Sequence, residues 1–317
     1  MTGARPVRAS TIRLDGQVAV VTGAGHGLGR EYALALASRG ASVVCNDLMG
    51  SAADATAEEI TRRGGVAVAE DSTVATPAGG EAIVRAAVDA FGTVDVLVNN
   101  AGQLRNAAFE DMTVDDFRAV LDTHLVGSFH VTQPAYRHMQ AAGFGRILFT
   151  SSSAGMFGSP WQANYAAAKA GLVGLCNVVA LEGAAHGITA NAIMPMALTG
   201  IGAGGPPPYP PDVLRETARA LGPLIPYMTV ENVAPLVVYL ASRDCTETRT
   251  VFSVGCSHVA RVFVGATAGW YSPDPTAMTP EDVAANLATA CDLTGFGIPD
   301  SMNDASRFVA QHLPEAR

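Results

Sequence analysis

Short apolar runs that alternate with longer helical patterns are the feature that most constrains how this chain can fold. The runs include VAVV (18–21), ASVVCND (41–47), VDVLVNN (94–100), GRILFTSS (145–152) and ITANAIMP (188–195), with TRTVFSVG (248–255) as a candidate last strand. Continuous apolar runs, rather than strict alternation, indicate strands that are buried on both faces. Strands that alternate with helices predict an α/β fold, in which a doubly wound parallel sheet is covered by helices.

The same rhythm predicts the domain organisation. We expect residues 1–13 to be a flexible N-terminal arm, because they are basic but lack the apolar core of a secretory signal. Residues 14–256 are expected to form one domain, and residues 257–317 a C-terminal extension packed on the same domain or on a partner subunit. The extension contains a helical pattern, with Thr279 as its N-cap and Pro280 as its first residue.

A loop dense in glycine and proline interrupts the pattern after the sixth strand. TGIGAGGPPPYPP (199–211) cannot lie inside a helix or a central strand. It follows the strand that ends at Pro195, on the side where such sheets bind ligands. We expect a substrate lid over about residues 196–230; the alternative is a disordered insertion.

Composition excludes several classes of function. The net charge is −9 and no basic run with interleaved aromatic residues is present, so a nucleic acid is not an expected partner. The five cysteines are scattered and never spaced as CxxC, which argues against a disulfide framework and against a metal site. No stretch reaches about 18 uninterrupted apolar residues, so no membrane span is expected. We therefore expect a soluble, cytoplasmic protein.

The segment VAVVTGAGHGLGREYALAL reads as a strand, a glycine turn and a helix. Its glycines fit G-x-x-x-G-x-G through Gly23, Gly27 and Gly29, whereas GxGxxG would need glycine where the chain has Leu28. Glycines let the backbone turn tightly and approach a pyrophosphate, which binds to the N–H groups at a helix start. The pattern predicts a Rossmann-like dinucleotide site; the alternative is a tight turn without a ligand.

Asp47 closes the second strand, 24 residues after Gly23. A carboxylate there can accept hydrogen bonds from the adenosine ribose and would repel a 2′-phosphate, which predicts NAD rather than NADP. The alternative is a solvated turn residue. His26, inside the glycine turn, could offer a phosphate some compensation when it is protonated.

Four motifs occur in an order and spacing that resemble a known superfamily. TGAGHGLG, NNAG (99–102), SSSAG (151–155) and Tyr165-x-x-x-Lys169 identify residues 14–256 as a member of the short-chain dehydrogenase/reductase superfamily. GLGREYALALASRGASVVCNDL and GSPWQANYAAAKAGLVGL further resemble the dehydrogenase part of the peroxisomal multifunctional enzyme type 2 family, whose members join it to hydratase and sterol-carrier domains.

The resemblance implies that Ser152, Tyr165 and Lys169 are the catalytic residues. A spacing of four places Tyr165 and Lys169 on one helix face, where the ammonium is expected to lower the pKa of the phenol so that it can act as a base. Ser152 would hold the substrate oxygen, with Ser151 and Ser153 as near alternatives. The alternative for Tyr165 and Lys169 is a surface pair on an amphipathic helix.

The resemblance also implies the remaining cofactor contacts. Asp71 is expected at the adenine edge, Asn99 beside the adenosine, and Pro195 and Thr199 at the nicotinamide end, while Lys169 would also bond the nicotinamide ribose. The full predicted set is Gly23, Gly27, Leu28, Gly29, Asp47, Asp71, Asn99, Tyr165, Lys169, Pro195 and Thr199.

One position departs from the superfamily pattern. THLVGSF carries His124 where most members have asparagine. A role in a proton relay and a role as a satisfied core histidine both remain open.

The implied function is NAD-dependent oxidation of a secondary alcohol on a bulky apolar substrate, either a 17β-hydroxysteroid or a 3-hydroxyacyl-CoA. One alternative is an NADPH-dependent 3-oxoacyl thioester reductase, against which Asp47 argues. Another is a non-catalytic, nucleotide-binding partner subunit. By analogy with the superfamily we expect a homodimer or homotetramer.

Overall fold

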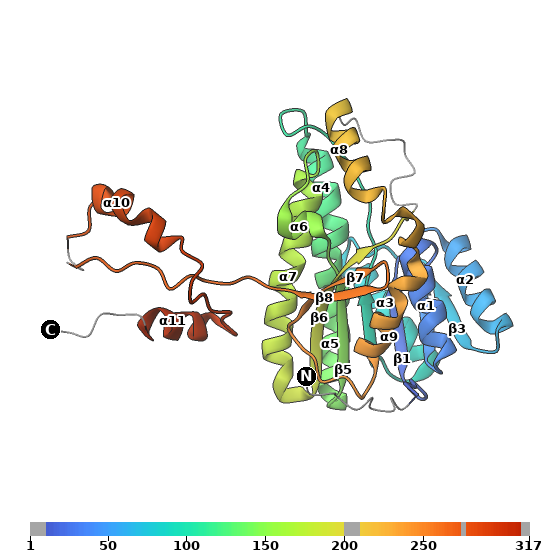
Figure 1. Ribbon diagram of the computed structural model, residues 1–317. Helices are drawn as coiled ribbons and strands as arrows, with labels where there is room; N and C mark the ends of the chain where they lie inside the picture. Colours follow the sequence, from blue (N-terminus) through green and yellow to red (C-terminus); the bar gives the residue numbers. More distant parts are fainter. Residues whose placement is uncertain (1–10, 200–209, 274–276, 312–317) are drawn as a thin grey trace, which may run out of the picture. The chain divides into compact units, whose positions relative to one another are not determined.

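The computed structural model describes residues 11–199, 210–273 and 277–311. In this part of the chain one sheet of eight strands forms the centre of the fold (Figure 1). The strands are β1 (Val18–Thr22), β2 (Ser42–Asn46), β3 (Val66–Glu70), β4 (Val96–Asn99), β5 (Gly145–Thr150), β6 (Ile188–Met196), β7 (Val251–Gly255) and β8 (His258–Val262).

The strand order β3-β2-β1-β4-β5-β6-β7-β8 confirms the predicted fold class. Neighbouring strands from β3 to β7 pair in parallel. Strands β1, β4 and β5 are buried along their whole length, as their continuous apolar runs predicted. The order reverses between β1 and β4, and ligands of such sheets bind at the carboxyl ends of the strands near this point.

Helices cover both faces of the sheet (Figure 1). On one face α1 contacts α2 and α9, and on the other α5 contacts α3 and α7. The helices of this unit are α1 (Gly27–Ser38), α2 (Gly50–Arg62), α3 (Pro77–Phe91), α4 (Val114–Leu121), α5 (Gly127–Ala142), α6 (Ser153–Phe157), α7 (Ala163–Gly183), α8 (Pro211–Leu221) and α9 (Ala234–Ala241). Shorter helical turns are η1 (Asp122–Val126), η2 (Ala184–His186), η4 (Ile225–Tyr227) and η5 (Val230–Asn232).

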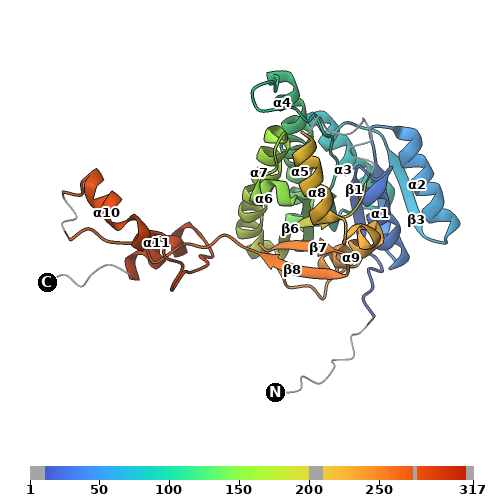
Figure 2. The ribbon, with the colours of Figure 1, turned by 45° about the horizontal axis from the view of Figure 1, so that its top comes forward.

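A hairpin adds strand β8 beyond β7, which the sequence suggested as the last strand. Strands β7 and β8 lie side by side at the sheet edge (Figure 2). Cys256 and Ser257 connect them with φ angles of 51° and 58°, the left-handed geometry that two-residue hairpin turns require.

The chain separates into two compact units, Met1–Arg261 and Val262–Arg317. The second unit contains α10 (Pro280–Ala290) and α11 (Met302–Gln311). Helix α10 begins as predicted, because the Thr279 side chain accepts a hydrogen bond from the Asp282 N–H and the Asp282 carboxylate accepts one from the Thr279 N–H. Whether the extension packs on the same domain or on a partner subunit stays a prediction.

The predicted lid is described only in part. Residues 200–209 lie outside the described residues, and with them most of the glycine- and proline-rich loop. The part that follows forms α8, which has no buried residue. A lid function for this segment stays a prediction.

Residues 163–186, which comprise α7 and η2, are long and apolar enough to span a membrane by length and composition. In the structure this helix contacts β5 and β6 of the sheet as well as α4 and α6. Leu172, Cys176 and Ala180 are buried in the fold, while Val178 and Leu181 on the same helix are exposed.

Candidate functional site

The glycine turn has the close approaches that a dinucleotide cradle needs. Gly23 and Gly27 adopt φ angles of 66° and 52°. A Cβ atom at Gly29 would lie 2.0 Å from the carbonyl oxygen of Gly23, so the turn tolerates no side chain there. The first turn of α1 has neither a side-chain cap nor an acidic residue, which leaves its N–H groups available to an anion. These residues fit a pyrophosphate.

Asp47 lies against this turn from the end of β2. Its Oδ2 accepts a hydrogen bond of 3.0 Å from the Gly25 N–H, and its Oδ1 accepts one of 3.0 Å from the Met49 N–H. A carboxylate has about four acceptor positions, so about two remain for hydroxyl groups of a ribose. Asp71 is exposed after β3 and lies beside Gly50 at the start of α2.

Two consecutive asparagines at the end of β4 have different roles. The buried Asn99 donates from Nδ2 to the Thr132 hydroxyl (3.0 Å), which ties β4 to α5. Asn100 donates from Nδ2 to the carbonyls of Thr22 (3.0 Å) and Gly23 (3.2 Å), and so holds the glycine turn itself. The sequence analysis did not predict Asn100, whose only signal was its place in NNAG.

Pro195 and Thr199, which the sequence placed together at the nicotinamide end, lie in different surroundings. Pro195 lies within β6, opposite Val254 of β7. Thr199 is near the glycine turn, since a Cβ atom at Gly27 would lie 3.6 Å from its Cβ. The structure therefore brings Thr199 to the start of α1, at the end of the site where a pyrophosphate would bind.

The predicted catalytic residues lie together. Ser152 is the N-cap of α6, and its side chain is close enough to Tyr165, on the first turn of α7, to lower the pKa of that phenol. Lys169 lies one turn further along α7, with its Nζ 5.4 Å from the centre of the Tyr165 ring. The hydroxyl of Ser151 instead donates to the Lys169 carbonyl (2.8 Å), while Ser153 is exposed within α6. The geometry therefore favours Ser152 over both of its neighbours.

Lys169 is a buried cation that makes a single side-chain hydrogen bond to the described part of the chain. Its side chain is buried, with 3% of the residue exposed, and its Nζ donates to the Thr150 carbonyl (2.5 Å). Burial lowers the pKa of Lys169 to about 7. Near neutral pH the amine can therefore both hold and release a proton.

The pKa of Tyr165 differs from the expectation. Burial of the phenol raises its pKa, and the hydrogen bond from Ser152 works in the opposite direction. The sequence predicted that Lys169 would lower this pKa. In the folded chain the loss of water around the ring has the larger effect.

His124 lies against Tyr165 in the π-helical turn η1. The two rings meet edge to face with centroids 5.2 Å apart. Its Nε2 lies 3.0 Å from the backbone nitrogen and 2.8 Å from the carbonyl oxygen of Gln103, whereas its Nδ1 is buried and has no hydrogen-bond partner among the described residues. Burial and the nearby Lys169 lower the pKa of His124 to about 3, so the ring is neutral at physiological pH.

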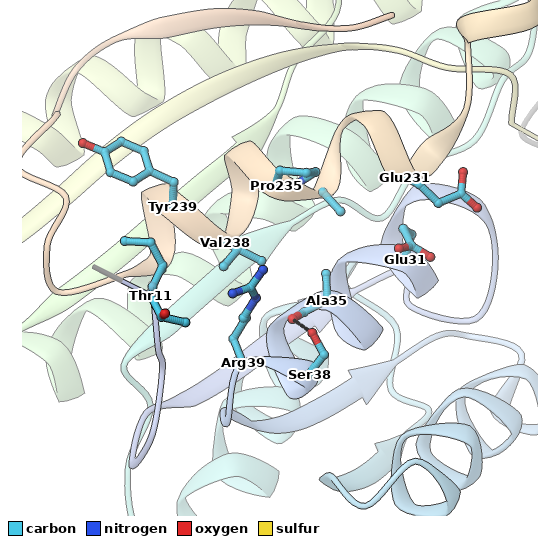
Figure 3. A pocket seen from close by; sticks show the side chains of 11 residues that line it. Thr11, Glu31, Ala35, Ser38, Arg39, Glu231, Pro235, Val238 and Tyr239 are labelled. Atoms are coloured by element: carbon cyan, nitrogen blue, oxygen red, sulfur yellow. Dashed lines mark hydrogen bonds between the residues drawn. The ribbon is translucent and has the colours of Figure 1, made fainter. Parts of the chain in front are cut away.

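A cavity of about 520 Å³ lies apart from these residues, between α1 and α9 (Figure 3). It contains none of the predicted site residues. Glu31 and Glu231 line one end, and burial together with the charge of Glu231 raises the pKa of Glu31. Among the described residues no cluster of three or more His, Cys, Asp or Glu side chains could hold a metal ion.

Comparison with known proteins shows which family the chain matches. The model of the short chain dehydrogenase family matches residues 17–201. The chain is 41% identical over 316 residues to the peroxisomal multifunctional enzyme type 2 of Mus musculus. This match covers 96% of this chain and 40% of the mouse protein. It is 42% identical over 288 residues to a putative short-chain type dehydrogenase/reductase of Mycobacterium tuberculosis, covering 88% of this chain and 95% of that protein.

A solved structure agrees with these sequence matches. The full-length peroxisomal multifunctional enzyme type 2 from Drosophila melanogaster superposes with a TM-score of 0.77 at 34% identity. The match covers 95% of this chain and 50% of that chain. This chain thus spans about half of the fly protein and 40% of the mouse relative.

Proposed function

This chain belongs to the short-chain dehydrogenase family and is an oxidoreductase that acts on CH–OH groups, and from that premise we propose that it oxidises a secondary alcohol of a bulky apolar substrate with NAD. The observation that carries the proposal is the meeting of Ser152, Tyr165 and Lys169 on α6 and α7, which follow β5 at the carboxyl edge of the sheet. Ligands of doubly wound sheets bind at this edge.

The three side chains supply the acid–base chemistry. When bound, NAD supplies the acceptor for the hydride that leaves the carbinol carbon. Ser152 holds the substrate oxygen beside Tyr165, whose phenolate oxygen accepts the alcohol proton in oxidation and whose hydroxyl returns it in reduction. Lys169, with a pKa near 7, stabilises the negative charge that develops on the phenolate oxygen.

The substrate class rests on the resemblance to the multifunctional enzymes. We propose a 3-hydroxyacyl-CoA or a 17β-hydroxysteroid, to be separated by initial rates with each alcohol under NAD and NADP. Since the mouse and fly relatives are named as peroxisomal, we propose a peroxisomal location, in place of the cytoplasm, for cells that contain this compartment. A homodimer or homotetramer remains the proposed assembly, which sedimentation would measure.

The test of the catalytic assignment is Tyr165→Phe. Loss of the acid–base group should lower kcat by about 10²- to 10⁴-fold. Tyr32→Phe is a matched control, because its hydroxyl is buried in the core without a partner and lies outside the site. Unchanged activity in Tyr165→Phe would show that the catalytic assignment of Tyr165 is wrong. Absence of turnover by the unaltered chain would instead favour the non-catalytic alternative.

The test of the cofactor preference is Asp47→Ser. Removal of the carboxylate should weaken NADH binding and improve NADPH binding, which fluorescence quenching measures for both nucleotides. If the unaltered protein bound NADPH more tightly than NADH, the NADPH-dependent reductase would replace the dehydrogenase as the better assignment.

A further inference from the structure

Residues 103–107, which follow β4 and its NNAG motif, have no regular secondary structure but are held at both ends. At the first end, the His124 ring nitrogen Nε2 lies within 3.0 Å of both backbone groups of Gln103. The Gln103 side chain donates from Nε2 to the Ala119 carbonyl (3.0 Å) and to the Thr123 hydroxyl (2.7 Å). The start of this segment is thereby fixed to the helix that carries His124.

At the other end the segment is held by the residues that lead into α7. The Ala107 N–H donates to the carbonyl of Trp161 (3.1 Å). Trp161 adopts a φ of 63°, a left-handed conformation that is unfavourable for a residue with a side chain. The fold maintains this unfavourable conformation at the point where the chain meets the segment and then enters the catalytic helix.

Asn164 joins the middle of the segment to the catalytic residue itself. It is fully buried and directly precedes Tyr165. Its Oδ1 accepts a hydrogen bond of 2.7 Å from the Tyr165 N–H, a first-turn group with no partner inside the helix. Its Nδ2 donates to the carbonyls of Arg105 (2.8 Å) and Asp116 (3.1 Å). Both amide donors and the carbonyl of one side chain are therefore satisfied.

We propose that Asn164 is a positioning residue for alcohol oxidation, acting through Tyr165 and residues 103–107; this inference rests on the function proposed above. The segment reaches Tyr165 by two routes. One is the amide of Asn164, which holds the Tyr165 backbone. The other is His124, which bonds Gln103 and packs its ring against the Tyr165 ring. A shift of the segment moves the phenol through both routes.

The expected effect is on the chemical step. A displacement of a reacting group by about 1 Å can lower a rate by about 100-fold. Because Asn164 bonds none of the residues of the glycine turn, its loss leaves the dinucleotide cradle in place. The variant Asn164→Ala should therefore lower kcat by about 10- to 100-fold while the dissociation constant of NAD changes by less than about twofold.

A second buried asparagine provides the matched control. Asn191 on β6 is also fully buried, donates from Nδ2 to the Glu247 carbonyl (2.7 Å) and accepts from the Thr250 N–H (3.1 Å). It ties the same sheet together without contact to Tyr165. Both alanine variants should lower Tm, but only Asn164→Ala should lower kcat of the folded protein.

The experiment compares kcat, KM, NAD affinity and Tm of the unaltered chain, Asn164→Ala and Asn191→Ala, all measured well below Tm. Equal kcat values for the two variants would overturn the positioning role and leave Asn164 as a packing residue. If Asn164→Ala does not fold, Asn164→Ser, which keeps a hydroxyl and removes less volume, is expected to show the same kcat-specific loss, and its absence overturns the role equally. An unaltered chain that oxidises no alcohol would instead refute the proposed function.

Discussion

Strand β5 has a buried cation near each end, and the two are bonded very differently. Arg146, at the amino end, is 7% exposed, and Lys169, whose Nζ bonds the last residue of the strand, is 3% exposed. The guanidinium of Arg146 donates to four carbonyls, those of Ser242, Gly145, Gly187 and Cys245. It also lies 4.3 Å from the centre of the Phe144 ring. Within residues 11–199, 210–273 and 277–311 the ammonium of Lys169 makes one hydrogen bond, to the Thr150 carbonyl.

The difference suits Arg146 to a structural role and Lys169 to the catalytic role proposed for it. Arginine keeps its proton when buried and spreads its donors over fixed acceptors, so Arg146 fastens the loop after α9 to the start of β5. Lysine loses its proton more readily when buried, and the pKa of Lys169 falls to about 7. An amine with few partners and a pKa near neutrality is suited to a proton-transfer site.

The largest expected effect comes from removing the Lys169 cation. Lys169→Met should lower kcat by at least about 100-fold, because nothing then stabilises the developing phenolate of Tyr165. Its Tm should be unchanged or higher, since a poorly solvated charge is replaced by an apolar side chain of similar length. Steady-state kinetics and thermal unfolding measure both. Retained activity in this variant would end the distinction drawn between the two cations.

Arg146→Met should have the opposite effect on the two measurements. Four carbonyls each lose one hydrogen-bond donor, which should lower the free energy of unfolding by about 3 kcal/mol. The kcat of the folded fraction should be unchanged, because Arg146 lies at the end of β5 opposite the site. Urea unfolding gives the stability, and activity is measured without denaturant. A variant that is stable but inactive would contradict the structural role.

The two cations should also differ in how stability depends on pH. The pKa of Lys169 is about 7 in the fold and near 10.4 in the unfolded chain, so between these values the unfolded chain binds the extra proton. Stability of the protein without cofactor should therefore rise from pH 7 to pH 10. The stability difference between the unaltered chain and Lys169→Met should change by about 2 kcal/mol between pH 7 and pH 9. A difference that is constant with pH would show that the amine is not desolvated.

The smallest effect concerns His124, which faces Lys169 and Tyr165. The pKa of His124 is about 3 in the fold and near 6.5 in the unfolded chain. Between these pH values the unfolded chain binds the extra proton, so the stability of the fold decreases as the pH drops below 6.5. Between pH 7 and pH 5, His124→Gln should lose about 1–2 kcal/mol less stability than the unaltered chain. The exposed His258 provides the control variant His258→Gln. An equal acid response in the two variants would argue against a buried, neutral ring at position 124.

The fold could be predicted from the sequence because it leaves local patterns, and so could the proximity of Ser152, Tyr165 and Lys169. Continuous apolar runs identified β1, β4 and β5, and the capping residues of α10 were read directly from Thr279 and Pro280. The spacing from Ser152 to Tyr165 and Lys169 placed these residues together before the structure did. The hairpin strand β8 was not anticipated, since its turn residues Cys256 and Ser257 are not typical of left-handed turns.

Burial and long-range hydrogen bonds could not be predicted, because they leave no pattern in the local sequence. Asn100 and Asn164 look like ordinary polar residues, and only the fold shows that one holds the glycine turn and the other joins residues 103–107 to Tyr165. The raised pKa of Tyr165 has the same origin, because desolvation depends on what surrounds a side chain in space.

The sequence by itself determined which residue types stand at the carboxyl ends of the strands. The succession of strands and helices along the chain, the glycine spacing and the helix periodicity are all properties of residues close together in the sequence. The tertiary structure alone decided how those residues are charged and held. Packing from distant segments removes water from Lys169, His124 and Tyr165, and the electrostatic energy of a group depends on that removal.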